Sequence, residues 1–262
     1  MKKNAVRETA AHLAAGIVSV GAFLAVWQLA VLTTSLKKIM PGPVTVLKAF
    51  MDSFTVNIGQ YNIIWHTAFS LTRVLIAYTA ACVIGIILGL LMGRVRFIEA
   101  VFRPFYEIIR PVPPIAWISL SILWFGLGEM TKYFIIFLSA FSSITYTTFS
   151  GVRMVDPVLI GAGRMLGANS FQVFTTIILP ASVPYIFSGM QVALGTSWAT
   201  VVAAEMVRSS EGVGWIIVSG MEANNITQIL VGIVAIGVMG FLLATLLRKI
   251  ENVLCAWNAG GV

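Results

Sequence analysis

Charged residues are scarce in this chain. Only 10% of its 262 residues are Asp, Glu, Lys or Arg, whereas 58% are hydrophobic, and the mean hydropathy is +0.94. A soluble domain carries roughly 25% charged residues, so this composition excludes an ordinary water-soluble domain. The apolar surplus has to face lipid. The length suits an all-α polytopic membrane protein with about six transmembrane helices of roughly 20 residues each.

Cysteine and histidine are almost absent. Cys82 falls in an apolar run and Cys255 near the end of the chain, so no disulfide is expected, and His12 and His66 are too far apart to suggest a metal site. The chain also has no Gly-x-x-x-x-Gly-Lys-Ser/Thr nucleotide motif. No Ser-His-Asp or paired-carboxylate constellation is found. We therefore expect no enzyme, no metal and no cofactor, and energy that comes from a partner or an ion gradient.

Apolar runs divide the chain into three expected regions. Residues 1–71 hold an N-terminal span (13–32), too long for a signal-peptide core, and an amphipathic segment (44–54) on the outer surface. Residues 72–250 hold the core, and residues 251–262 form a cytoplasmic tail. The core spans are expected at 72–92, 102–125, 132–149, 185–207 and 228–247. Residues 215–218 are apolar but too few to cross, which favours a re-entrant or surface helix.

Two features mark the core spans. Gly85 and Gly89, four residues apart, favour close helix packing. The segment Arg110-Pro-Val-Pro-Pro-Ile interrupts the span at 102–125, because each proline removes a backbone donor and crowds the preceding turn. Broken backbone at membrane depth is tolerated where it is buried in protein or lines a cavity.

The basic residues predict the orientation. Of the 17 Lys and Arg residues, 11 fall in segments expected inside and the other 17 − 11 = 6 in segments expected outside. Positive charge gathers on the cytoplasmic side, so both termini are expected in the cytoplasm. The net charge of +7 has this cause and is no sign of nucleic-acid binding.

A polar-flanked segment, residues 151–184, separates two apolar blocks on the expected cytoplasmic side. Asp156-Pro157 is typical of a helix start, with Asp as N-cap and Pro at the first helical position. Gly167 suits the left-handed residue that ends a helix. Asn169 or Ser170 is suited to cap a second helix, which Pro180 is expected to end.

This segment presents apolar side chains at positions expected to be exposed, namely Leu166, Phe171 and Phe174. Apolar residues on a loop indicate a protein partner. A DNA-binding helix-turn-helix is the other interpretation of two helices joined at a glycine. It is disfavoured because the segment holds little basic charge beyond Arg164 and the preceding Arg153, and nucleic-acid binding needs a basic face.

Four polar or aromatic residues in or near the spans are candidates for a translocation path. Glu107 and Arg110 form either an ion pair one helical turn apart at the cytoplasmic interface or, for Arg110 beside the proline break, an anion-attracting group in the path. Glu205 is either an interhelical or interface residue or part of the path or gate. Trp198 is either a packing residue or a substrate contact.

The segment 161–180 resembles the cytoplasmic coupling loop of ABC importer permeases. Ala162, Gly167, Ile177 and the Leu179-Pro180 pair stand at the family's spacing, whereas Gly161 stands where the family has Glu, and Gly163 where it has Ala. The resemblance covers about residues 73–248 and points to the nitrate/sulfonate/taurine branch. It extends to Arg110-Pro-Val-Pro-Pro-Ile-Ala-Trp117, Leu123-Trp-Phe-Gly-Leu-Gly-Glu129, Gly151-Val-Arg-Met-Val-Asp-Pro157 and Trp198-Ala-Thr-Val-Val-Ala-Ala-Glu205.

This resemblance implies a type I ABC importer permease fold and a set of partners. They are two copies of a separate ATPase subunit, a second permease copy, an extracytoplasmic solute-binding protein and membrane lipid, without nucleic acid. The expected solute is a small anion, preferably an alkanesulfonate or taurine-like compound. Nitrate, bicarbonate or a pyrimidine-type precursor are the alternatives. The residues expected to form the ATPase-coupling loop are Ala162, Arg164, Leu166, Gly167, Ala168, Phe171, Phe174, Ile177, Leu179 and Pro180.

Two other classes stay open at this point. A secondary transporter driven by H⁺ or Na⁺ would be expected to show inverted repeats and paired carboxylates near the membrane midplane. We find no convincing repeat, and Glu107 and Glu205 both lie near span ends. A membrane-embedded signalling or assembly subunit is the remaining alternative.

Overall fold

The structure is a computed structural model that describes residues 2–35, 39–207 and 209–255, with the backbone alone for residues 2–13. Most of the tail expected at 251–262, and the basic residues Lys37, Lys38 and Arg208, lie outside the described residues. The chain forms two compact units, Met1–Ile64 with Ile216–Ala235 and Trp65–Trp215 with Ile236–Val262.

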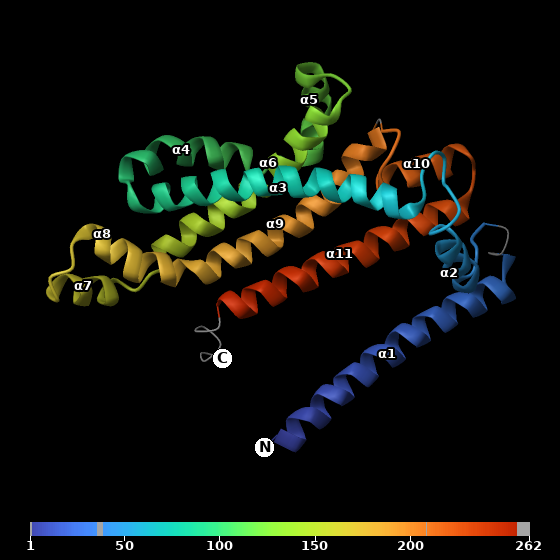
Figure 1. Cartoon of the computed structure of the whole chain (residues 1–262), viewed down its shortest axis with the longest axis horizontal. Helices are drawn as coiled ribbons and strands as arrows, with labels where there is room; N and C mark the ends of the chain where they lie inside the picture. Colours follow the sequence, from blue (N-terminus) through green and yellow to red (C-terminus); the bar gives the residue numbers. More distant parts are fainter. Residues whose placement is uncertain (1, 36–38, 208, 256–262) are drawn as a thin grey trace. The chain divides into compact units, whose positions relative to one another are not determined.

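Helices make up nearly all of the described chain (Figure 1). In order they are α1 (Lys2–Thr33), α2 (Pro43–Asp52), α3 (Ile63–Arg94), α4 (Arg96–Ile109), a 3₁₀ turn (Pro114–Trp117), α5 (Ile118–Phe125), α6 (Glu129–Arg153), α7 (Pro157–Met165), α8 (Ser170–Val173), a π-helical turn (Phe174–Ile178), α9 (Leu179–Val207), α10 (Val213–Glu222) and α11 (Ile226–Leu254).

The helix lengths confirm a polytopic membrane protein. Within the described residues, 5 helices are long and apolar enough to cross a membrane, or 6 if α4 and the segment through α5 count as one broken span. These helices occupy all the positions at which spans are expected. The residues expected as a short apolar stretch, 215–218, lie within α10, which is too short to cross a bilayer.

The proline segment breaks the third span as expected. The axes of α4 and of the segment Pro114–Phe125 differ in direction by 89°. Arg110 still continues the helical backbone of α4, and its N–H donates to the Tyr106 carbonyl at 2.9 Å. Beyond it, Pro111, Pro113 and Pro114 have no N–H to donate, so the α-helix cannot continue. Gly126 ends α5 with a φ of +74°.

In the first unit, α2 begins after Gly42 with Pro43 in its first turn. Gly42 lies so close to α1 that a Cβ atom there would be 2.7 Å from Oε1 of Gln28. The helix buries Val46 and exposes Val44 and Leu47. The expected amphipathic helix is therefore present.

The second unit is built around α6, which packs against α3 on one side and α9 on another (Figure 1). Small residues allow the backbones to approach closely. A Cβ atom on Gly89 would lie 2.6 Å from Cβ of Thr148 and 2.8 Å from the Thr145 carbonyl oxygen, and one on Gly85 would lie 3.2 Å from Ile144 Cγ2. The expected close packing at the two glycines is confirmed.

Substitution of Gly89 by Ala tests this packing. The added methyl group has to displace the backbone of α6, since one of its contacts is a carbonyl oxygen. We expect Gly89→Ala to destabilise the purified protein by about 1–3 kcal/mol and to lower its melting temperature in detergent. Gly195→Ala in α9 is the matched control, because a Cβ atom there would meet no atom within 4 Å other than its chain neighbours and the backbone of its own helix. Equal melting temperatures for both variants would contradict this packing.

Candidate functional site

Local sequence determines the shape of the α7–α8 segment. The Asp156 side chain caps α7 by accepting from the Val158 N–H at 2.8 Å, and Pro157 occupies the first turn. Gly167 follows α7 with a φ of +85°, in the left-handed region. Asn169 and Gln172 then form a reciprocal capping box at the start of α8. The caps expected at Asp156 and Gly167 are confirmed, and of the two candidates Asn169 and Ser170 it is Asn169 that caps α8.

The expected end of the second helix at Pro180 is wrong. The chain continues from α8 through the π-helical turn into α9, and Pro180 is the second residue of α9. The missing N–H of proline costs little in the first turn of a helical segment. The π-helical turn ends at Ile178 and α9 begins at Leu179, so Pro180 lies in the first turn of α9. α8, the π-helical turn and α9 therefore form one continuous helical segment, Ser170–Val207.

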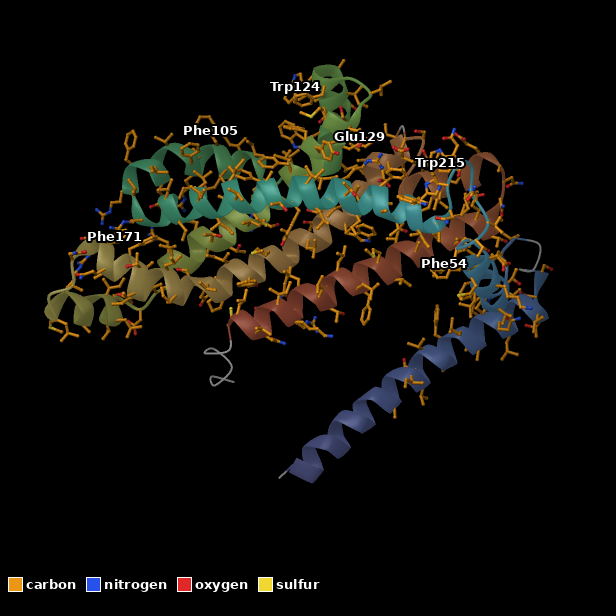
Figure 2. The ribbon with its side chains drawn as sticks, in the orientation of Figure 1. Phe54, Phe105, Trp124, Glu129, Phe171 and Trp215 are labelled. Atoms are coloured by element: carbon orange, nitrogen blue, oxygen red, sulfur yellow. The ribbon has the colours of Figure 1, made fainter. Side chains whose placement is uncertain are left out.

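Three apolar side chains protrude where α7 ends and α8 begins. Leu166 is 89% exposed and Met165 is 85% exposed. Phe171 on α8, labelled in Figure 2, is 70% exposed. Exposed Leu166 and Phe171 agree with the sequence analysis, whereas Met165 was not expected. Phe174 is only partly exposed, because the Arg94 guanidinium lies over its ring at 4.9 Å.

The other expected coupling residues support this surface. Arg164 is exposed, and the partly buried residues are Ala162, Ala168, Ile177, Leu179 and Pro180. A Cβ atom on Gly163 would lie 2.6 Å from Cδ1 of Ile177, so the glycine allows α7 to pack on the π-helical turn. Arg94 also donates to the Ser170 carbonyl at 3.0 Å, which ties α8 to the end of α3.

A cavity of about 620 Å³ opens among α4, the broken segment, α6 and α9. Its lining is rich in hydroxyl groups, contributed by Tyr106, Ser139, Ser142, Ser143, Tyr146, Thr147, Thr196 and Thr200. Arg110 adds the cation of this lining. Its guanidinium lies over the Tyr146 ring, 4.0 Å from the ring centre.

The four expected path residues have different surroundings. Arg110 lines the cavity. Glu107 pairs with Arg103 at 2.8 Å, so the alternative pair with Arg110 is not formed. Trp198 is buried, and its indole N–H donates to the Ile236 carbonyl at 3.0 Å, which is a packing contact. Glu205 lies fully buried in a separate polar cluster.

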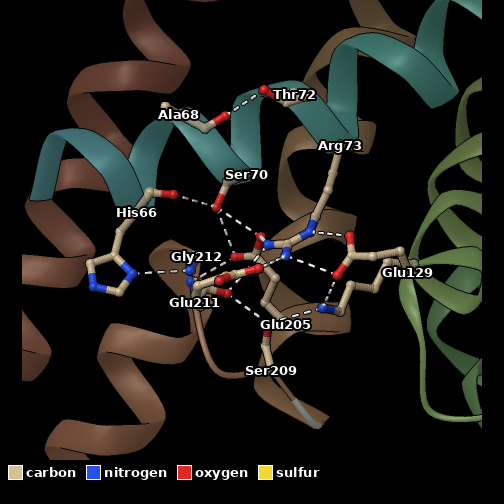
Figure 3. Close-up of polar contacts among 12 residues, drawn as sticks. His66, Ala68, Ser70, Thr72, Arg73, Glu129, Glu205, Ser209, Glu211 and Gly212 are labelled. Carbon is tan, nitrogen blue, oxygen red and sulfur yellow. Dashed lines mark hydrogen bonds and ion pairs between the residues drawn. The ribbon is translucent and has the colours of Figure 1, made fainter. Parts of the chain in front are cut away.

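This polar cluster centres on Arg73 of α3 (Figure 3). Its Nε and Nη2 bind the two carboxylate oxygens of Glu129 at 2.6 and 2.9 Å. Its Nη1 donates to Glu205 at 2.8 Å, and Nη2 also reaches Glu211 at 3.1 Å. The arginine side chain is 3% exposed and that of Glu205 is 0% exposed. One guanidinium thus joins α3, the start of α6, the end of α9 and the segment before α10.

Further contacts complete the cluster. Ser70 donates to Glu205 at 2.8 Å and accepts from the Val213 N–H at 2.9 Å. The Gly214 N–H donates to Glu205 at 3.0 Å, and the Gly212 N–H donates to His66 Nδ1 at 3.1 Å (Figure 3). The positive φ of Gly212, +111°, lets the backbone turn around the carboxylate.

The residues of this cluster, apart from Glu205, were not expected as functional residues from the sequence. A signal was present, because Arg73 lies in an α-helix with many apolar residues, where a charge is costly and usually paired. The partners could not be read from the sequence, since Glu129 and Glu205 are 56 and 132 positions away.

Fold and sites together define a class. The chain is a polytopic helical membrane protein with a cavity among its spans and an apolar helix pair exposed at one end of a span, an arrangement that suits a transport subunit.

Comparison with known proteins narrows this class. The family described as binding-protein-dependent transport system inner membrane component matches residues 81–254. The chain is 34% identical over 233 residues to the taurine transport system permease protein TauC of Escherichia coli, covering 88% of this chain and 85% of TauC. It is 32% identical over 240 residues to the nitrate import permease protein NrtB of Synechocystis sp., covering 90% and 86%.

A solved structure agrees with the fold. An inward-facing form of the MetNI methionine ABC transporter matches with a TM-score of 0.59 and 19% identity, over 70% of this chain and 92% of that chain. The protein belongs to the binding-protein-dependent transport system inner membrane components, the permease subunits of ABC importers. Its fold is that of a type I importer permease. The family implies a separate ATPase subunit and a binding protein as partners.

The Arg73 cluster yields a stability prediction. Removing one partner of a buried ion pair costs about 3–5 kcal/mol, because the other charge is left uncompensated. We therefore expect Arg73→Leu to lower the melting temperature strongly. The double variant Arg73→Leu/Glu205→Leu should recover part of the loss. Thermal unfolding of the detergent-purified protein measures both.

Arg103→Leu is the control, since Arg103 forms its ion pairs with a side chain that is 54% exposed. Exposed pairs contribute little, so its melting temperature should stay close to that of the unsubstituted protein. A double variant no more stable than Arg73→Leu would show that the buried charge is not the source of the loss.

Proposed function

We propose that this chain is the permease of an ATP-driven importer that moves a small anionic solute, an alkanesulfonate or taurine-like compound, into the cytoplasm. In this assembly two copies of the chain span the bacterial inner membrane, two ATPase subunits bind on the cytoplasmic side and a solute-binding protein delivers the solute from outside. Both termini face the cytoplasm. The core is residues 72–250, with the coupling loop within 151–184.

One observation carries the proposal. Leu166 and Met165 protrude at the end of α7, and Phe171 protrudes from α8, which continues through the π-helical turn into α9. Burying such side chains in a groove of a partner is favourable by about 1.5–3 kcal/mol each. A partner that closes on nucleotide binding would therefore move α9 through this contact, which supports an ATPase as the partner.

The solute class rests on similarity. Two of the relatives are named as permeases for taurine, which carries a sulfonate group, and for nitrate, which is an anion. Arg110 gives the cavity a positive charge that would attract such groups. Nitrate, bicarbonate and a pyrimidine-type precursor are the alternative solutes for the same type of permease. An ion-gradient-driven transporter is the alternative mechanism, and it would move solute in liposomes without ATP.

Cysteine crosslinking tests the coupling contact and the orientation together. Ala168 lies between α7 and α8, beside the protruding Leu166. We expect Ala168→Cys to crosslink to the co-expressed ATPase in a manner that changes with ATP, and to resist an impermeant maleimide in intact cells. Thr55→Cys is the control, because Thr55 is exposed in the segment after α2 that is expected outside.

Thr55→Cys should react with the maleimide in intact cells and form no crosslink to the ATPase. Maleimide labelling of Ala168→Cys from outside would overturn the orientation. An Ala168→Cys permease that never crosslinks to any ATPase, although solute is taken up, would overturn the coupling contact.

A further inference from the structure

Arg110 directly follows the last residue of α4 and is exposed in the single chain. Its guanidinium stacks on Tyr146, which lies seven residues before Arg153 at the end of α6, about 10 Å along the helix axis at 1.5 Å per residue. The cavity next to it extends further, to Ser139 and Leu138 near the middle of α6. A charge at such depth is costly unless it is compensated.

Glu107, one helical turn before Arg110, pairs with Arg103, so Arg110 has no carboxylate partner within the described part of the chain. No Asp or Glu oxygen there lies within the 4.0 Å ion-pair distance of its nitrogens, whereas Arg73, Arg103 and Arg153 each have carboxylate partners. Stacking on Tyr146 occupies one face of the guanidinium and leaves its N–H edge for hydrogen bonds in the plane. Planar recognition of an oxyanion uses this edge.

Hydroxyl donors extend the same site. Ser139 is 4% exposed, and its Oγ accepts from Thr200 at 3.2 Å, so its own proton is left to donate. The Tyr106 hydroxyl is committed to the Ser142 carbonyl at 2.6 Å and thereby places Oγ of Ser142 beside it. Ser143 has no hydrogen-bond partner for its hydroxyl among the described residues, and it lines the cavity next to Ser142.

We propose that the cavity beside Arg110 is an oxyanion-binding site in the membrane domain, in which the guanidinium edge and the hydroxyls of Ser139, Ser142 and Ser143 hold a sulfonate-like or nitrate-like group during passage. The proposal rests on the function proposed above and deepens it by placing the solute.

The chemistry of the site explains both capture and release. A guanidinium that binds two oxygens of one anion makes charge-assisted hydrogen bonds, which are about twice as strong as neutral ones. Serine hydroxyls add neutral donors without adding charge. A site with one cation and several neutral donors therefore attracts an anion, but it binds the anion less tightly than a site with several cations would. Weaker binding suits transport, because the solute has to leave the site again.

Charge-selective labelling of a cysteine in the cavity tests the proposal without knowledge of the solute. Ser143→Cys is introduced in a background in which Cys82 and Cys255 are replaced by Ala, after ATP-driven uptake of the background has been confirmed. The complex of permease, ATPase and binding protein is placed in phosphatidylcholine nanodiscs. Rates are measured for a methanethiosulfonate reagent with a sulfonate group and for one with a quaternary ammonium group.

We expect the ratio of the sulfonate rate to the ammonium rate to be at least tenfold higher at this cysteine than for a thiol in free solution. The reason is that the positive charge of Arg110 raises the local electrostatic potential. Adding Arg110→Gln should remove this preference. The matched control is Arg96→Gln, which removes the same charge from the same helix at an exposed residue that does not line the cavity. It should leave the preference unchanged.

Protection identifies the occupant. Nitrate and taurine, added separately, should slow labelling, and an uncharged amide of similar size should not. Phosphatidylglycerol in the nanodisc is the second arm, because a lipid phosphate has the same chemistry as the solute. Protection by phosphatidylglycerol without protection by nitrate or taurine would overturn the solute site and assign Arg110 to a lipid headgroup.

Two further results separate the site from the proposed function. A missing charge preference, or a thiol that reacts with neither reagent, in a complex that still imports taurine would overturn the site alone. A preserved, Arg110-dependent preference in a complex that imports no oxyanion with ATP would support the site and overturn the proposed importer.

Discussion

The buried guanidinium of Arg73 is the interaction on which the membrane core depends most. Its hydrogen bonds to Glu129, Glu205 and Glu211 join segments that are far apart in the chain. A charge inside a membrane protein is costly without a partner, so pairing with Arg73 favours the one arrangement in which these segments meet. The close α3–α6 packing at Gly85 and Gly89 then continues that arrangement along the helices.

The two ends of α9 have different tasks in this arrangement. Near its last turn, Glu205 is held by Arg73, Ser70 and the Gly214 N–H. At its other end α9 continues from α8 through the π-helical turn, next to the exposed Leu166 and Phe171. The hydroxyl-lined cavity lies against the part of α9 between the two ends.

Much of the architecture could be predicted from local chemistry. The length of the apolar runs identified the spans, and three prolines identified the break, which the structure shows to be a bend of 89°. The caps at Asp156 and Gly167, and the choice of Asn169 or Ser170 for the third cap, followed from the sequence because capping depends on neighbours within a few residues. Pro180 was interpreted wrongly for a related reason. Whether a proline ends a helix depends on the hydrogen-bond register before it, and the π-helical turn that sets this register is not visible in the residue types.

Composition and local spacing were enough to identify the class of the protein, because the apolar residues require a lipid environment and residues 161–180 follow the spacing of a known family. What each polar residue in the spans does became clear from the folded structure. Glu107, Arg110, Trp198 and Glu205 were equivalent candidates along the chain, but they became an ion-pair partner, a cavity cation, a packing residue and a buried anion. The physical reason is that the cost of a buried polar group depends on the partners brought to it, and those partners come from distant helices.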